Sequence, residues 1–147
     1  MSQSEGALSV ADRPNIILII TDQQRFETIR ALATELTVPL IGFAGAPFTV
    51  ASYLIEGAPS RTYARTKALM LGDPDLWFAL LDRLVDLAVA SLRSQVAAGA
   101  RALQLFDSWA GILPPDEFDR WVIKPAAAIV KRLRARHGKV CSTWNPA

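Results

Sequence analysis

The stretch from residue 103 to residue 111 constrains the fold more than any other part of this sequence. It reads L-Q-L-F-D-S-W-A-G, a short apolar strand that runs directly into a polar, aromatic loop ending at Gly111. Just before it, A-A-G-A closes a long apolar-striped helix, with Gly99 placed for the left-handed position that ends many helices. A helix, a tight turn, a short buried strand and a loop are typical of a βα unit in a parallel sheet. The chemistry of such folds lies at the carboxyl ends of the strands, which residues 106–109 occupy here.

A second segment has the same organisation. Residues 38–43 read as a strand, with Pro39 near its start, where a missing backbone N–H is tolerated. The sequence G-F-A-G-A-P-F at residues 42–48 is predicted to form the following loop, and its small residues allow the backbone to approach a neighbour closely. We therefore expect residues 42–48 and 106–109 to form the functional edge of one parallel sheet.

The remaining segments complete an α/β alternation. A continuous apolar, β-branched run at residues 14–21 predicts a strand buried on both faces. Helices are predicted at residues 26–36, 49–56 and 61–71, from Asp73 to about residue 97, and from residue 115 to about 136, the last interrupted and restarted at Pro125. One more strand is predicted to open at residues 140–141. A closed (βα)8 barrel needs about 250 residues. These 147 residues therefore predict either a partial (βα)8 TIM barrel, with parallel strands and crossover helices, or a small open α/β fold.

Composition narrows the functional classes. A net charge of +2 gives no reason to expect nucleic-acid binding, and the late basic residues are predicted to form a solvated helix face: Lys124, Lys131, Arg132, Arg134, Arg136 and Lys139. The longest early apolar run, residues 16–20, is far too short to span a membrane. A single cysteine, Cys141, rules out an internal disulfide and favours a reducing compartment, so we expect a cytoplasmic protein.

Four segments resemble one enzyme family. Residues 38–57 read V-P-L-I-G-F-A-G-A-P-F-T-V-A-S-Y-L-I-E-G, similar to the central signature of the uroporphyrinogen decarboxylases. The segments T-K-A-L-M at 66–70, D-P-D-L-W at 73–77 and Q-L-F-D-S-W-A-G at 104–111 continue the resemblance in order. The resemblance covers roughly residues 26–140 and rests on long, specific motifs.

The resemblance implies a barrel enzyme of porphyrin and heme biosynthesis. Such an enzyme decarboxylates the four acetate groups of uroporphyrinogen III to give coproporphyrinogen III, with no metal or cofactor. The family's substrate-contacting tyrosine and hydroxyl residue match Tyr53 and Ser108, which become the two predicted site residues. Phe43, Phe48 and Phe106 are at most an apolar wall. The implied partner is the tetrapyrrole, and a homodimer is left open.

The sequence also departs from the family. It lacks the early arginine-rich motif of the form R-Q-A-G-R, the aspartate-bearing motif after the second barrel strand, and the late histidine. Asp107 follows a strand but does not match the family's pyrrole-binding aspartate. We therefore expect the 147-residue chain to be inactive alone, and a non-catalytic porphyrin-binding remnant is an alternative.

The first residues resemble a different family. The sequence R-P-N-I-I-L-I-I-T-D-Q-Q-R at residues 13–25 is similar to the amino-terminal strand of sulfatases, and Asp22 matches a calcium ligand there. This resemblance divides the chain into a sulfatase-like segment, 1–25, and a partial decarboxylase barrel, 26–147, with a sulfatase-type metal hydrolase fragment as another alternative. A lone carboxylate makes no calcium site, and His137 with Cys141 gives too few zinc ligands, so no metal site is predicted.

Overall fold

The computed structural model describes residues 26–35, 37, 39–58, 60–137 and 142–145. Three parallel strands form one sheet in the order β1-β2-β3, with β1 at Ile41–Gly45, β2 at Ala102–Phe106 and β3 at Ser142–Asn145. The predicted strand at residues 14–21 and the predicted strand opening at residues 140–141 lie outside the described residues, and β3 begins directly after the latter. Parallel strands joined by helical crossovers confirm the α/β prediction, whereas these residues alone do not show a closed barrel.

The register of β1 against β2 corrects the predicted bounds of β1. Ile41 pairs with Ala102 and Gly45 pairs with Phe106, so the two strands have equal length. The strand predicted at residues 102–106 is confirmed. The strand predicted at residues 38–43 instead begins at Ile41 and ends at Gly45, where residues 44 and 45 still have partners on β2. Residues 44 and 45 are therefore strand and not loop, and residues 39 and 40 precede the strand.

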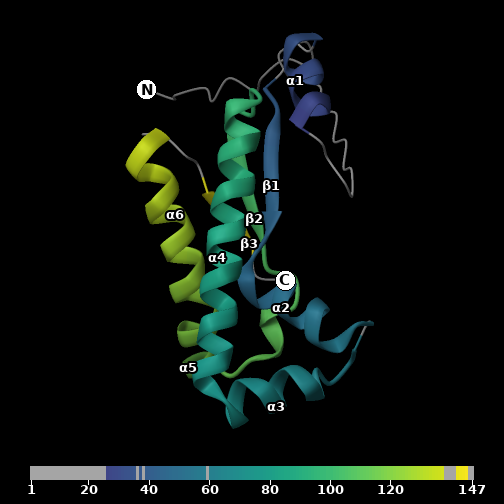
Figure 1. Ribbon diagram of the computed structural model, residues 1–147, viewed down its shortest axis with the longest axis vertical. Helices are drawn as coiled ribbons and strands as arrows, with labels where there is room; N and C mark the ends of the chain where they lie inside the picture. The colour runs from purple at the N-terminus through teal and green to yellow at the C-terminus, as the bar shows by residue number, and fades with distance from the viewer. Residues whose placement is uncertain (1–25, 36, 38, 59, 138–141, 146–147) are drawn as a thin grey trace, which may run out of the picture.

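The helices follow the predicted order. They are α1 at Phe26–Glu35, α2 at Pro47–Glu56, α3 at Ala64–Gly72, α4 at Pro74–Ala97, α5 at Pro115–Phe118 and α6 at Lys124–His137. A 3₁₀ turn, η2, lies at Ala110–Ile112, and a π-helical turn, η3, lies at Asp119–Ile123. Figure 1 shows α4 and α6 side by side along the sheet, and α4 contacts both α6 and β1.

Helix α4 begins and ends as its sequence predicts. The Asp73 carboxylate accepts a hydrogen bond from the backbone N–H of Leu76 at 3.0 Å, and Pro74 occupies the first helical position. At the other end, the N–H of Gly99 donates to the carbonyl of Val96, and the N–H of Ala100 donates to that of Gln95. This pair of bonds is a Schellman motif, and Gly99 has the positive φ, 113°, that the motif requires.

The apolar stripe of α4 supplies both parts of the core. Its carboxyl-terminal half packs with the sheet and α6, where the buried residues include Val89, Leu92, Leu103, Leu105, Ile129 and Leu133. Its amino-terminal half packs against α2, where the buried residues include Phe48, Trp77, Leu81, Trp121 and Val122. The long helix thus holds α2 and the strands in one packed unit, as the spacing of its apolar residues predicted.

The interruption and restart expected at Pro125 are present, and the interruption is a π-helical turn between α5 and α6. Proline has no N–H to donate to the carbonyl four residues earlier and would disrupt an ordinary α-helix there. The chain instead widens into η3 just before the proline, where the N–H of Lys124 donates to the carbonyl of Asp119 five residues back. The wide turn also places Trp121 and Val122 in the core, so helical structure continues from α5 through η3 into α6.

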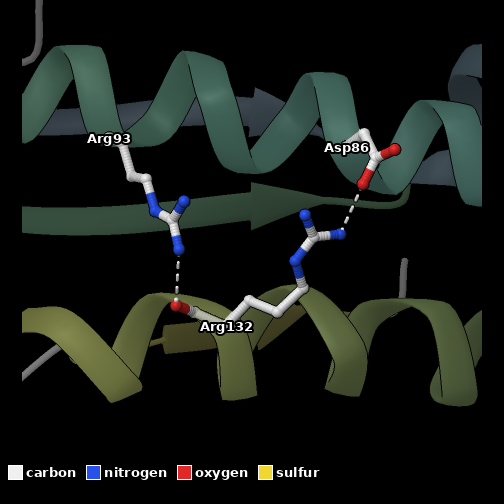
Figure 2. A network of polar contacts seen from close by, with 3 residues as sticks. All are labelled: Asp86, Arg93 and Arg132. Atoms are coloured by element: carbon white, nitrogen blue, oxygen red, sulfur yellow. Dashed lines mark hydrogen bonds and ion pairs between the residues drawn. The ribbon is translucent and has the colours of Figure 1, made fainter.

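Polar contacts join α4 to α6 at the surface. Figure 2 shows Arg132 of α6 reaching Asp86 of α4, with Nη1 to Oδ1 at 2.6 Å. From α4, Arg93 donates through Nη2 to the backbone carbonyl of Arg132 at 3.1 Å. About half of each charged side chain in the ion pair is exposed, so it contributes at most about 1 kcal/mol. Arg132, one of the late basic residues, is therefore half-exposed and also pairs locally with Asp86.

We expect Gly99→Ala to destabilise the fold. An added Cβ would lie 2.6 Å from the Cβ of Ala33, and the φ of 113° is unfavourable for any residue with a side chain. The loss should be about 1–3 kcal/mol or more in the free energy of unfolding, measured by urea denaturation. Gly72→Ala is the matched control, because a Cβ at this last residue of α3 meets nothing within 4 Å. Equal stability of the two variants would contradict this account.

Candidate active site at the ends of two strands

The carboxyl ends of β1 and β2 lie side by side. The two strands finish at the paired residues Gly45 and Phe106, and the N–H of Ala46 then donates to the carbonyl of Phe106 at 2.6 Å. Beyond this last bond the chain enters α2 on one side and the segment 107–109 on the other. The two segments predicted to share an edge of the sheet are therefore adjacent.

Tyr53 lies on α2 and reaches across to the other segment. Its hydroxyl accepts a hydrogen bond from Nε1 of Trp109 at 2.8 Å. The two rings are perpendicular, with centroids 6.4 Å apart, an edge-to-face geometry that aromatic pairs favour. Because 53% of Tyr53 is exposed, its hydroxyl is accessible to a ligand.

Ser108 is exposed beside this pair. In the sequence it follows Asp107, which is buried, and precedes Trp109. Within the part of the chain that the structure describes, the Ser108 hydroxyl has no hydrogen-bond partner. Its immediate neighbour in the chain is the residue that bonds to Tyr53. The structure thus brings both predicted site residues to the same pair of strand ends, while their contact with a substrate stays a prediction.

Asp107 has a role that its position after a strand did not reveal. It is 1% exposed, and its Oδ1 accepts two hydrogen bonds from Thr49, one from the backbone N–H at 3.1 Å and one from Oγ1 at 2.6 Å. Thr49 lies in the first turn of α2, where N–H groups lack intrahelical partners. The N-cap residue, Ala46, has no side-chain acceptor. The carboxylate at the end of β2 therefore caps the helix that follows β1, a contact between segments 58 residues apart.

Burial disfavours the charged form of this carboxyl. Burial raises the pKa of Asp107 from its ordinary value of 3.8 to about 6, although the two bonds from Thr49 oppose the shift. Its second oxygen, Oδ2, is buried and has no hydrogen-bond partner among the described residues. Near neutral pH the ionised carboxylate is thus held at a cost in stability.

The three phenylalanines expected to form an apolar wall have different positions. Phe43 and Phe106 pack edge to face, with centroids 5.8 Å apart, and 38% of Phe106 is exposed. Phe48, in contrast, is fully buried and packs against Trp77 in the core. The expectation was wrong for Phe48 because the first turn of α2 directs it inward, toward α4.

A glutamine that the sequence did not single out holds β1 in place. The side-chain amide of Gln95, on α4, accepts from the N–H of Phe43 at 2.8 Å and donates to its carbonyl at 2.9 Å. Gly42 makes room for this contact, since a Cβ there would lie 2.6 Å from Oε1 of Gln95. Both backbone groups of Phe43 are thereby satisfied by one side chain.

Tyr63 also packs against Trp109, and the three residues Tyr53, Tyr63 and Trp109 form an aromatic cluster. Its ring lies 5.8 Å from that of Trp109, and Tyr63 is only 5% exposed. Burial raises the pKa of its hydroxyl, with smaller contributions from Tyr53 and Glu56. Its φ of 51° is left-handed, at the residue just before α3. No sequence pattern marked Tyr63, because it enters the cluster only through the fold of the α2–α3 connection.

The described residues contain no group of three or more histidine, cysteine, aspartate or glutamate side chains able to hold a metal ion. The sequence-based candidates Asp22 and Cys141 lie outside the described residues, and so does the side chain of His137. No described helix combines the length and the apolar character needed to cross a bilayer.

Comparisons with known proteins identify relatives of these segments. The family model described as uroporphyrinogen decarboxylase (URO-D) matches residues 11–145. A uroporphyrinogen decarboxylase of Geobacillus kaustophilus is 57% identical over 104 residues, which are 70% of this chain and 30% of the relative. One from Frankia casuarinae is 59% identical over 105 residues, 71% and 28% of the two chains. One from Streptomyces griseus is 56% identical over 113 residues, 76% and 31%. The chain thus spans about a third of the length of these curated relatives.

The sulfatase resemblance is not supported by these comparisons. The family match begins at residue 11 and therefore extends across residues 13–25, including Asp22. The segment compared with sulfatases on the basis of a short apolar strand is included in the same match as the rest of the chain. Apolar, β-branched strands ending in aspartate occur in many parallel sheets, so such a pattern is weakly specific.

We expect the carboxyl of Asp107 to make stability depend on pH. The folded chain retains its proton up to about pH 6, whereas the unfolded chain releases it near pH 3.8. The contribution of this group to the free energy of unfolding therefore falls as pH rises through this window, by up to about 3 kcal/mol, and is constant above it. Asp107→Asn keeps an oxygen acceptor for Thr49 and cannot ionise.

Urea unfolding of both proteins at several pH values tests this expectation. The stability of Asp107→Asn relative to the unsubstituted chain should increase between about pH 4 and pH 6 and then level off. Taking the difference between the two proteins removes the contributions of the other carboxyl groups. A difference that does not change with pH, or that decreases as pH rises, would show that Asp107 is not held in this way.

Proposed function

The chain belongs to the uroporphyrinogen decarboxylase family, and we propose that it contributes part of the substrate site of an enzyme that decarboxylates uroporphyrinogen III. The observation that carries the proposal is the hydrogen bond from Trp109 to Tyr53. It joins two segments that are far apart in the sequence, lie within the family match and carry the two predicted substrate contacts. The chain spans about a third of the length of its relatives. The decarboxylase activity of the whole enzyme is therefore also part of what we propose.

The chemistry requires groups that hold carboxylates in place. Loss of CO2 from an acetate on a pyrrole requires protonation of the adjacent ring carbon, so positive charge develops on the ring. A preorganised negative group stabilises that charge, while the many other carboxylates of the substrate must be held by donors. Neutral hydroxyls suit this second task because they fix one carboxylate at a time.

Tyr53 and Ser108 have hydroxyls suited to binding carboxylates. The oxygen of Tyr53 accepts from Trp109, which leaves its hydrogen available for donation. The Ser108 hydroxyl is exposed and has no partner among the described residues. Both residues come from a single chain, so the proposal needs no second copy. A hydrogen bond to a charged acceptor contributes about 1.5–3 kcal/mol.

Asp107 does not fit the negative group that the reaction needs. Its carboxylate is 1% exposed and bonded to Thr49 through Oδ1, so it does not face a ligand. The sequence also lacks the arginine-rich, aspartate and histidine motifs that the family resemblance implies for catalysis. The function proposed for these 147 residues is therefore substrate binding within a decarboxylase.

We expect Tyr53→Phe and Ser108→Ala each to weaken the binding of uroporphyrinogen III by about tenfold, since each removes one donor to a carboxylate. Anaerobic isothermal titration calorimetry measures the affinity. Tyr63→Phe and Ser94→Ala are matched controls that delete the same atoms from a buried tyrosine of the cluster and an exposed serine on α4. A similar loss of affinity in the controls would count against the assignment.

The unsubstituted chain should bind uroporphyrinogen III without decarboxylating it. The reason is that the donors are present whereas the motifs expected to stabilise the pyrrole cation are not. Separation of the porphyrins after oxidation reveals any product with fewer carboxyl groups. Turnover would contradict the expected inactivity, and absence of binding would contradict the proposed function.

A further inference from the structure

The buried hydroxyl of Thr49 connects α2 to the segment 107–109, which follows β2. The Thr49 hydroxyl has a single hydrogen, which it donates to Oδ1 of Asp107 at 2.6 Å. Its oxygen accepts the backbone N–H of Trp109 at 3.3 Å. Thr49 is 5% exposed, so its hydrogen-bonding groups are occupied by the protein and not by a ligand.

Both N–H groups of Trp109, in its backbone and in its indole ring, donate hydrogen bonds within the protein. The backbone N–H of Trp109 is held by Thr49, and its indole N–H donates to the Tyr53 hydroxyl at 2.8 Å. Tyr63 packs against the same indole, with ring centroids 5.8 Å apart. The indole is thus held at its backbone, along its ring and at its nitrogen. Because Trp109 is the donor, the hydrogen of the Tyr53 hydroxyl must point elsewhere.

We propose that Asp107 and Thr49 are positioning residues, which hold Trp109 so that its indole N–H directs the hydroxyl hydrogen of Tyr53 toward a carboxylate of the ligand. The part of this inference that concerns the ligand rests on the proposed function. The part that concerns Trp109 and Tyr53 is a property of the chain without ligand. Neither Asp107 nor Thr49 touches the substrate in this scheme, since both side chains are buried.

The chain contains a matched control for this arrangement. Thr66 is fully buried, and both its N–H and its hydroxyl donate to one carboxylate oxygen of Glu56, each at 2.9 Å. Thr49 makes the same two bonds to Asp107. Thr49→Val and Thr66→Val therefore delete the same group from the same kind of contact, but only Thr49 accepts a bond from Trp109.

The first test needs no ligand. The indole N–H resonance of Trp109 is followed by ¹H–¹⁵N NMR, assigned with Trp109→Phe, and its position without the Tyr53 bond is defined with Tyr53→Phe. Thr49→Val should move this resonance toward the Tyr53→Phe position, and Thr49→Ser, which restores the hydroxyl, should return it. Thr66→Val should leave it in place.

A second pair of variants covers the case in which Thr49→Val does not fold. Asp107→Ala removes the acceptor and should move the resonance, whereas Asp107→Asn retains an acceptor oxygen and should not. An unmoved resonance in both Thr49→Val and Asp107→Ala would overturn the inference. So would an equal movement in Thr66→Val, since the effect would then be one of general stability.

The second test uses uroporphyrinogen III as the probe. Thr49→Val should weaken its binding by about tenfold, as loss of the Tyr53 donor does, with Thr49→Ser and Thr66→Val close to the unsubstituted chain. If the indole resonance responds but no protein binds uroporphyrinogen III, the positioning of Trp109 stands and the proposed function fails. If the unsubstituted chain binds it and Thr49→Val binds it equally well, the inference fails and the proposed function stands.

Discussion

The parallel pairing of β1 with β2 is the constraint on which the rest of this structure depends. Parallel strands of equal length and in register finish at the same edge of a sheet. The pairing of Gly45 with Phe106 thus brings the start of α2 next to the segment 107–109. The contacts between α2 and the segment 107–109 follow from this adjacency, including the bond between Tyr53 and Trp109.

Packing around α4 keeps that adjacency in one arrangement. The helix fills the space behind both strands with its apolar stripe, and it also reaches β1 with the polar side chain of Gln95. The amide satisfies both backbone groups of Phe43, while the lack of a side chain at Gly42 allows the helix to approach. A shift of β1 by one residue would break both polar contacts and reverse which side chains face the core. The register is therefore strongly specified.

The polar contacts at the strand ends stabilise the start of α2, but they require a carboxyl group to be buried. Asp107 caps α2 through its two bonds from Thr49, but its burial raises the pKa of its carboxyl to about 6 and leaves Oδ2 without a partner among the described residues. A buried polar group that costs stability is common where function depends on position. The same two-bond contact between Thr66 and Glu56 has the opposite electrostatic effect, because the carboxyl of Glu56 is more exposed and the bonds from Thr66 lower its pKa.

The local sequence determined where helices and strands begin and end at positions where a single side chain or peptide group sets that boundary. Asp73 and Pro74 predicted the start of α4, Gly99 predicted its end, and the apolar run predicted β2 without error. The family motifs predicted Tyr53 and Ser108 as site residues, a prediction that stands untested, and the fold brings both to the same strand ends. The boundary of β1 and the position of Phe48 were predicted incorrectly, since they depend on which strand and helix lie opposite.

Only the tertiary structure revealed the connections between the elements. The cap that Asp107 provides for α2, the clamp of Gln95 on β1 and the entry of Tyr63 into the aromatic cluster each join residues that no sequence spacing relates. The interruption before Pro125 was predicted from the local rule, but its form was not: it is a π-helical turn whose residues Trp121 and Val122 lie in the core. Local preferences act within a few residues along the chain. Contacts across a sheet and between helices are selected by the packing of the whole fold, and this packing determined how the site is held together.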